Sequence, residues 1–464
     1  MKTHLILALA FAATSVLAQG PLTPPPGANP SIGPVNALTP GGLPQGTMKT
    51  LHQVEPRTAI PGGTTGFTLG QSGAYYLTGN IVVASGDGIT INASNVTLDL
   101  NGFSILSSAT PAGGNGIRLG QGLRNVAIRN GNIGGDGLGG AFTGGVYYVV
   151  SGFPQPPSNL RVADLSVAAS EIGISTSNSV ATCHVERCMV IGGSVRGIQG
   201  GIVKDCVVEG GPIFGRIVKD CSVTTPGTIG IYAEVAENCY ATSAGTAIQA
   251  KCLVNSYGTG GGASDVIAAG VAQNVWAEGG SGTGDGIEAT VVGNSYAIRQ
   301  SDLGGDSTGS GIKGTIIANS SALSVAGKAL DASVILGSRG RAVSGAGASG
   351  TLIFATYGET DGEKGIEVPS VVLSSGLVNG SIGRTNRIGG NTAATAAIHA
   401  DSSLISNSLG YAFFNGAWGI GNTGGLVTGS IGDGGDRGIT GDMIHGSYGS
   451  GTITTVAGLE FDSN

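Results

Sequence analysis

The chain has 464 residues, of which 87 are glycine and 11% are charged, and its formal net charge is -7. This acidic balance argues against nucleic acid and anionic membrane surfaces as partners. It argues less strongly against an acidic polymer, because a local basic patch or bound calcium could offset the repulsion. The hydrophobic fraction of 40% is enough for a core, and the glycine content favours a core spread along a repetitive fold.

The first 47 residues do not have the composition of a folded domain. Residues 1–18 combine Lys2, an apolar stretch and a small-residue cleavage site ending at Ala18, which is the pattern of a secretory signal peptide. Residues 19–47 are rich in Pro and Gly and predict an extended linker. No later stretch is long and apolar enough to cross a bilayer. We therefore expect a secreted or surface-exposed protein without a transmembrane segment once the signal is removed.

The remaining chain is expected to divide into three parts. Residues 48–66 mix charged and apolar side chains ahead of the first strand signals, so we interpret them as an N-terminal cap. Residues 67–375 alternate apolar and polar side chains, as at Ile89–Ile91, and predict a regular series of strands. Residues 376–464 keep this pattern less strictly. We expect them to continue the same fold irregularly and to end in a C-terminal cap, with a separate small domain as the alternative.

One short unit recurs through the middle of the chain with a constant internal spacing. An apolar residue opens each unit, and a Cys, Ser or Val follows eight positions later. The residue just before that second member is Asp or Asn in every unit except the two end ones, which have Arg187 and Gly337. The pairs are Val180/Cys188, Ile198/Cys206, Ile213/Cys221, Ile231/Cys239, Ile248/Ser256, Ile267/Val275, Ile287/Ser295, Ile312/Ser320 and Leu330/Ser338.

A repeat of about 15 to 25 residues that is rich in Gly, Val, Ile, Ser and Asn predicts a β-solenoid in which each unit is one coil. The constant spacing means that two strands and the corner between them keep one geometry, whereas the other corner accepts insertions. Asp and Asn suit the constant corner because they tolerate the left-handed backbone conformation. The cysteines among the second members should form an inward column of unpaired thiols. Cys183 and Cys252 are then the pair that would form if any disulfide did.

The stretch DGITINASNVTLDLNGFSI, from Asp87 to Ile105, resembles the opening coils of secreted right-handed parallel β-helix proteins of the pectate-lyase-like superfamily. Later coils such as VKDCVV and AENCYA are similar to those of uncharacterised bacterial members. The resemblance covers residues from about 48 to about 375 and implies an all-β, single-stranded, right-handed parallel β-helix. It leaves the function open, because the superfamily includes lyases, glycoside hydrolases, epimerases, adhesins and binding proteins.

Candidate catalytic residues come from charged side chains in adjacent coils. Cleavage of a polysaccharide on a β-helix needs several carboxylates, which hold calcium or act as an acid and a base, together with a basic residue in lyases. The group of this kind is Asp285, Glu288, Arg299, Asp302 and Asp306. The alternative is that acidic residues in a Gly- and Ser-rich loop only keep that loop soluble.

A second candidate site is the long insertion between residues 134 and 158. It contains Tyr147, Tyr148 and Phe153, although aromatic residues are only 5% of the chain. Loops carry function more often than strands do, and aromatic rings offer flat apolar surfaces for sugars. These three are therefore candidate substrate-binding residues. The alternative is that their rings pack the loop onto the flank of the solenoid.

Three functions of different class fit these patterns. The first is a secreted protein that binds extracellular polysaccharide through side loops, with or without turnover. The second is a polysaccharide lyase or glycoside hydrolase, for which calcium could serve as cofactor. The third is a non-catalytic structural or adhesive surface protein. Carboxylates converging in a groove would favour the enzyme, exposed aromatic rings beside a groove would favour binding, and a smooth flank would favour the structural protein.

Overall fold

The computed structural model describes residues 56–148, 155–176, 182–260, 264–279, 283–299, 309–362, 364–369, 376–386, 396–413, 417–423 and 425–461. The chain divides into two units, Met1–Arg57 and Thr58–Asn464. The predicted signal peptide, the linker and most of the predicted cap before Thr58 lie outside the described residues. All of the structure below belongs to the second unit.

The described residues form 43 strands, and no helix among them is long and apolar enough to cross a membrane. The first strands are β1 Thr58–Ile60, β2 Phe67–Leu69, β3 Gly73–Leu77, β4 Ile81–Val83, β5 Ile89–Ile91, β6 Val96–Asp99, β7 Ser104–Ser107, β8 Asn115–Leu119, β9 Arg124–Gly135, β10 Gly144–Tyr148, β11 Ser158–Ala169, β12 Ile172–Ser175, β13 Cys183–Glu186 and β14 Met189–Gly192. The middle strands are β15 Arg196–Lys204, β16 Val207–Glu209, β17 Ile213–Lys219, β18 Ser222–Thr224, β19 Ile229–Glu237, β20 Tyr240–Ser243, β21 Thr246–Val254, β22 Tyr257–Gly260, β23 Ile267–Gln273, β24 Trp276–Gly279, β25 Ile287–Gly293, β26 Tyr296–Arg299, β27 Ile312–Ala318, β28 Ser321–Ser324, β29 Leu330–Leu336 and β30 Arg339–Ala342. The last strands are β31 Ala348–Ser349, β32 Leu352–Phe354, β33 Tyr357–Thr360, β34 Lys364–Val368, β35 Leu377–Asn379, β36 Ile382–Thr385, β37 Ala396–Asp401, β38 Leu404–Ser406, β39 Leu409–Ala412, β40 Trp418–Thr423, β41 Leu426–Thr428, β42 Ile431–His445 and β43 Tyr448–Phe461.

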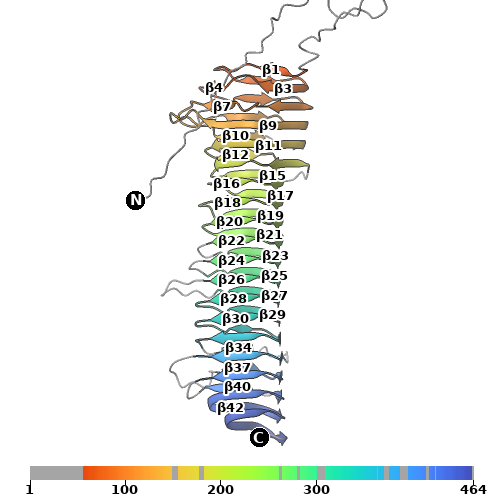
Figure 1. Cartoon of the computed structure of the whole chain (residues 1–464), viewed down its shortest axis with the longest axis vertical. Coiled ribbons are helices and arrows are strands. Elements are labelled where there is room, and N and C mark those ends of the chain that lie inside the picture. The colour runs from red at the N-terminus through yellow and green to blue at the C-terminus, as the bar shows by residue number, and fades with distance from the viewer. Residues whose placement is uncertain are drawn as a thin grey trace, which may run out of the picture. The chain divides into compact units, whose positions relative to one another are not determined.

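These strands stack as the coils of a parallel β-helix, each coil lying on the one before it (Figure 1). In the middle of the stack a coil has two strands, so β15 pairs in parallel with β17, and β16 pairs with β18. From β30 to β39 the partner is three strands later, as in β30–β33, because the long strand of the earlier coils is replaced by two short ones, such as β31 and β32. The predicted all-β, single-stranded parallel β-helix is confirmed. Its right-handed sense is what the resemblance implies.

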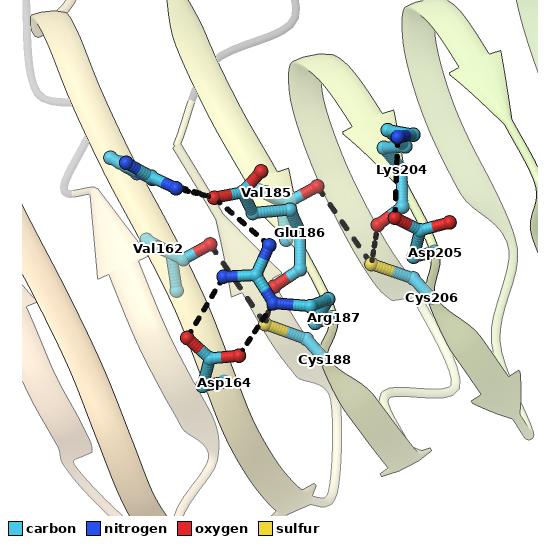
Figure 2. Close-up of polar contacts among 10 residues, drawn as sticks. Val162, Asp164, Val185, Glu186, Arg187, Cys188, Lys204, Asp205 and Cys206 are labelled. Atoms are coloured by element: carbon cyan, nitrogen blue, oxygen red, sulfur yellow. Dashed lines mark hydrogen bonds and ion pairs between the residues drawn. The ribbon is translucent and has the colours of Figure 1, made fainter.

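The constant corner of each coil has the predicted left-handed backbone. The φ angle is 53° at Asp205 and 54° at Asn274, and the remaining Asp and Asn corner residues of the repeat have values close to these. The two exceptions behave alike, with φ of 50° at Arg187 and 53° at Gly337. Arg187 also donates from Nε to Asp164 on the previous coil at 2.7 Å, so an ion pair replaces the ladder of Asx side chains there (Figure 2).

The inward column of thiols is confirmed, and the structure shows why Ser can replace Cys in its later coils. Cys206 and Cys221 are 1% and 3% exposed, and each thiol lies within hydrogen-bonding distance of the carbonyl oxygen two residues earlier, at 3.1 and 3.0 Å. Ser256 and Ser295 donate to the equivalent carbonyl, each at 2.8 Å. A small side chain with one donor therefore fits the corner. All six cysteines, including Cys183 and Cys252 of the suggested pair, are unpaired.

The two ends of the described unit continue the stack. Residues Thr58–Ile60, within the predicted cap, already pair in parallel with Tyr75–Leu77 and so contribute to the first coil. Strands after Leu377 keep the same parallel pairing and end with β42 against β43, where the register shifts several times. One apolar core runs through the stack from Ile60 to Ile444.

Candidate functional site

A shallow groove of about 920 Å³ crosses six successive coils in the middle of the stack. Its floor is the Cys/Ser column. One side is formed by the exposed Asp and Asn residues of the constant corner, and the other by aromatic side chains. We call it the aromatic groove, and its main lining residues are Asp205, Asp220, Asn238, Asn255, Asn274 and Asn294 on the corner side, Cys206, Cys221, Cys239, Ser256 and Val275 on the floor, and Tyr240, Tyr257, Trp276 and Tyr296 on the aromatic side.

Four aromatic rings on consecutive coils form a ladder along this groove. The rings of Tyr240 and Tyr257 are parallel to within 1°, with their centroids 5.0 Å apart. Trp276 lies 6.1 Å from Tyr257 and 4.8 Å from Tyr296, in tilted and edge-on contacts. Tyr240 and Trp276 each keep 46% of their surface exposed. The ladder is therefore a continuous aromatic surface that solvent can reach.

The ladder follows from strand register. Tyr240, Tyr257, Trp276 and Tyr296 begin β20, β22, β24 and β26 and are direct partners from coil to coil. Their immediate successors point inward and are small, so the strands lie close to the core while the rings face outward. These residues were not predicted as a site. The signal was present, because each one directly follows the Cys, Ser or Val that closes the repeated unit.

Polar groups surround the rings. Asn238, Asn255, Asn274 and Asn294 are exposed on the corner side, and the Asn274 side-chain amide donates to Asn255 at 3.0 Å. On β24, two residues after Trp276, Glu278 accepts a hydrogen bond from the Tyr257 hydroxyl at 2.8 Å. The groove thus combines stacking surfaces with amides that can both donate and accept hydrogen bonds.

The two predicted aromatic residues that the structure describes, Tyr147 and Tyr148, do not form a comparable surface. Tyr148 is 4% exposed and donates its hydroxyl to the Gln155 carbonyl at 2.6 Å, so its ring belongs to the core and its assignment as a sugar platform is corrected. Tyr147 is half-buried between Arg118 and Ser175 of the neighbouring coils. The reason is that the insertion contains a strand, β10, which takes its place in the stack. Phe153 lies outside the described residues.

The predicted carboxylates are brought together in part. Asp285 and Glu288 converge with Asp265 of the previous coil, which was not predicted, and one oxygen from each lies within 4.8 Å of the others. This carboxylate cluster is the group of described Asp, Glu, His and Cys residues close enough to hold a cation. Lys313 lies 3.4 Å from Asp285 and 3.1 Å from Glu288, so an ammonium group already neutralises part of its charge.

The three carboxyl groups differ in protonation. Burial raises the pKa of Asp265 to about 6, helped by its hydrogen bond with Glu288. The same hydrogen bond and the contact with Lys313 lower the pKa of Glu288. Asp265 therefore keeps its proton to a higher pH than Glu288 does. Burial also raises the pKa of Asp285.

Two members of the carboxylate cluster have a structural role that repeats elsewhere. Asp265 Oδ1 accepts the backbone N–H of Asp285 at 2.6 Å, and Asp285 Oδ1 accepts the backbone N–H of Ser310 at 2.5 Å. At the equivalent corner near the start of the stack, Asp87 Oδ1 accepts the Asn115 N–H at 2.9 Å. Each carboxylate thus fixes the next coil at the variable corner.

Of the remaining predicted catalytic residues, the structure describes Arg299 alone. Arg299 is 2% exposed on β26, and burial lowers its pKa despite the attraction of Asp285 and Asp265. Asp302 and Asp306 lie outside the described residues. The oxygens of the carboxylate cluster approach more closely than the roughly 5–5.5 Å of retaining or 6.5–9.5 Å of inverting glycosidases.

A second hollow, of about 680 Å³, lies on another face of the coils from Gly215 to Gly270. It has charged walls, with Glu234 held between Arg216 at 3.2 Å and Lys251 at 3.4 Å. Tyr232 also lines this hollow and is 46% exposed, the same fraction as Tyr240 in the aromatic groove.

Neither a protein-family model nor a curated protein matches the chain. Among solved structures it is similar to the crystal structure of the Dettilon tailspike protein, with 12% sequence identity and a TM-score of 0.20. The match covers 84% of this chain and 62% of the tailspike chain, so this chain spans less than two thirds of that protein. A likeness this distant carries no argument about the ligand.

Proposed function

We propose that this protein binds an extracellular polysaccharide in the aromatic groove, with the sugar chain running across successive coils. The observation that carries the proposal is the ladder of Tyr240, Tyr257, Trp276 and Tyr296, which is partly exposed beside a groove. Aromatic rings offer large, rigid apolar faces, and a few polar groups placed around them fix the orientation of a ligand. The Asn side chains of the corner supply such groups.

A purely structural role for the ladder explains less. Aromatic pairs across neighbouring strands stabilise a sheet by roughly 0.2–1 kcal/mol each, and this accounts for the contacts between the rings. It does not account for the groove or for the exposure of Tyr240 and Trp276. Exposed aromatic surface beside a hollow is typical of a binding site.

The ladder also sets the size of the ligand. Four rings at a coil spacing of about 4.8 Å extend over about 14 Å. A single sugar would contact one or two rings, whereas an oligosaccharide would contact all of them. The affinity should therefore rise with the number of sugars until the ladder is covered.

The proposal is tested by comparing Tyr240→Ala and Trp276→Ala with the matched control Tyr232→Ala. Tyr232 and Tyr240 are equally exposed and lie on neighbouring strands, but only Tyr240 lines the aromatic groove. Each groove variant should weaken binding by up to about tenfold, because the contact of one ring contributes on the order of 0.5–1.5 kcal/mol. Binding is measured by affinity electrophoresis and calorimetry on a panel of soluble polysaccharides.

The control should bind as the unchanged protein does. Equal losses in Tyr232→Ala and Tyr240→Ala, with folding intact by circular dichroism, would place the ligand elsewhere. The absence of any ligand across a broad panel would contradict the proposal.

The proposal does not extend to turnover at the carboxylate cluster. Asp265 and Asp285 use their oxygens to fix backbone N–H groups, and Glu288 contacts Lys313. We therefore expect no new reducing ends and no absorbance from unsaturated uronides when the same polysaccharides are incubated with the protein. Release of either product, and its loss in Glu288→Gln, would establish the enzyme instead.

A further inference from the structure

We infer that the polysaccharide of the aromatic groove is uncharged, a chain of neutral sugars and not of uronic acids. This inference rests on the proposed function and concerns the chemical class of its ligand. It follows from the acidic and neutral residues that line the groove and from the lack of Lys, Arg and His among its described lining residues.

The part of the groove that carries the rings offers neutral hydrogen-bonding groups. Opposite Tyr240, Tyr257, Trp276 and Tyr296 the corner residues are all Asn, whereas the two coils before them have Asp205 and Asp220. An amide can donate to a sugar hydroxyl and accept from it, but it brings no charge to pair with a carboxylate. The register thus places rings and amides, and no cation, along one line.

The charges that do lie on the groove are negative. Asp205 and Asp220 are exposed at one end. Glu278 lies beside the middle of the ladder and accepts the Tyr257 hydroxyl at 2.8 Å. A uronic acid chain brings one negative charge per sugar, and Asp205, Asp220 and Glu278 would repel any of these charges that come within about 8 Å, the distance over which salt at physiological strength screens charges. Neutral sugars avoid this repulsion.

Two lysines on the coils of Asp205 and Asp220 form ion pairs. Lys204 lies 3.5 Å from Asp205, and Lys219 forms an ion pair with Glu237. Among the described residues that line the aromatic groove there is no Lys, Arg or His. The second hollow differs, because Arg216 and Lys251 line it. An acidic glycan would therefore have a better electrostatic fit on that other face.

The test compares hexasaccharides of equal length by calorimetry. The neutral probes are the hexamers of β-1,4-glucose, β-1,3-glucose, β-1,4-mannose and β-1,4-xylose, and the acidic probes are the hexamers of galacturonic acid and mannuronic acid. We expect at least one neutral hexamer to bind, with about tenfold loss in Trp276→Ala and little change between low and high salt. Acidic hexamers should bind at least tenfold more weakly.

The outcomes separate this inference from the proposed function. Binding of an acidic hexamer that is lost in Trp276→Ala, without binding of any neutral one, would overturn the neutral assignment and keep the groove as the site. Binding that is unaffected by Trp276→Ala but lost in Lys251→Ala would overturn the proposed function, because the ligand would then occupy the second hollow.

A charge-removing variant checks the electrostatic cause. Asp220→Asn with Glu278→Gln keeps the hydrogen-bond acceptors that contact Asn238 and Tyr257 but removes two negative charges. It should strengthen binding of acidic hexamers at least threefold at low salt. Unchanged binding of the acidic hexamers would contradict the view that these carboxylates exclude them.

Discussion

At the scale of single residues, the left-handed corner decides which side chains the coil accepts. Most corner positions have Asn, Asp or Gly, but Ala355 occupies one of them with a φ of 46° and an exposed side chain. The left-handed conformation costs an L-residue roughly 1–2 kcal/mol unless its side chain can bond locally, as Asn and Asp do. Ala355 is therefore a strained position in an otherwise well-matched column.

Ala355→Asn should raise the free energy of unfolding by about 1 kcal/mol, because Asn adopts this conformation more readily than Ala. Chemical denaturation at neutral pH measures the change. Ala355→Val is the matched control and should lower the stability, since a β-branched side chain fits the left-handed region worst. A loss of stability in Ala355→Asn would mean that the corner is not strained.

The Asp265 carboxyl makes stability depend on pH. Its folded pKa, raised to about 6, lies above the ordinary 3.8, so its contribution is fully present below about pH 4 and is lost as the pH rises through 6. Asp265→Asn keeps an oxygen for the Asp285 N–H and cannot ionise. The variant should thus be more stable than the unchanged protein at pH 8, on the order of 1 kcal/mol after allowance for partial exposure.

Thermal unfolding at several pH values should show this gain shrinking to zero near pH 4. Asp87→Asn is the control, because Asp87 makes the same bond to a backbone N–H but lies beside Arg118 and not beside another carboxylate. A gain of equal size in both variants, or one that persists at pH 4, would rule out the shared proton of Asp265 and Glu288 as the cause.

At the scale of elements, one coil is an interchangeable unit. Ile248 pairs directly with Ile267, and Leu330 pairs directly with Ala348, so excision between such partners joins equivalent points of the stack. Each coil contacts mainly its two neighbours, and the interface left after excision is the same kind of parallel pairing. The fold should therefore survive the loss of a coil.

Deletion of residues 248–266 removes the coil that carries Tyr257, whereas deletion of residues 330–347 removes a coil outside the aromatic groove. Both variants should keep their β circular dichroism spectrum. The first should bind the polysaccharide several-fold more weakly, because the ladder is one ring shorter, and the second should bind as before. Equal binding by the two variants would show that the ladder does not make the contact.

At the scale of the whole molecule, the sequence predicts the scaffold better than the site. The constant spacing between Ile198 and Cys206 and its repeats is sufficient for the coil, the corner and the inward column, because each depends on local backbone geometry and on alternation. The residues that meet at the variable corner cannot be predicted in this way, because their contacts do not depend on local geometry. Asp265 meets Asp285 and Glu288 only after the coils have stacked, and insertions hide that register in the sequence.

The aromatic residues also show that a surface made by stacking is harder to predict from sequence than the coil itself. Tyr147 and Tyr148 were favoured because they lie in a long insertion, but β10 carries them into the stack and buries Tyr148. Tyr240 and Trp276 belong to the regular half of the repeat, where neither a long insertion nor a cluster of charges marks a candidate site. A column of like residues at a fixed offset in a solenoid forms a surface, and this can be found from sequence once the repeat is aligned.

The spacing of the rings in the aromatic ladder has a consequence for which polysaccharides fit the proposed site. Successive rings lie one coil apart, about 4.8 Å. The centroids of the closest ring pairs are 5.0 and 4.8 Å from each other. A sugar chain whose repeat matches this interval stays in phase with every ring, whereas a chain with a longer repeat drifts further out of phase at each coil. Discrimination between linkages should therefore accumulate along the groove, so that a protein with no fitted pocket for any one sugar can still select a polymer by its pitch.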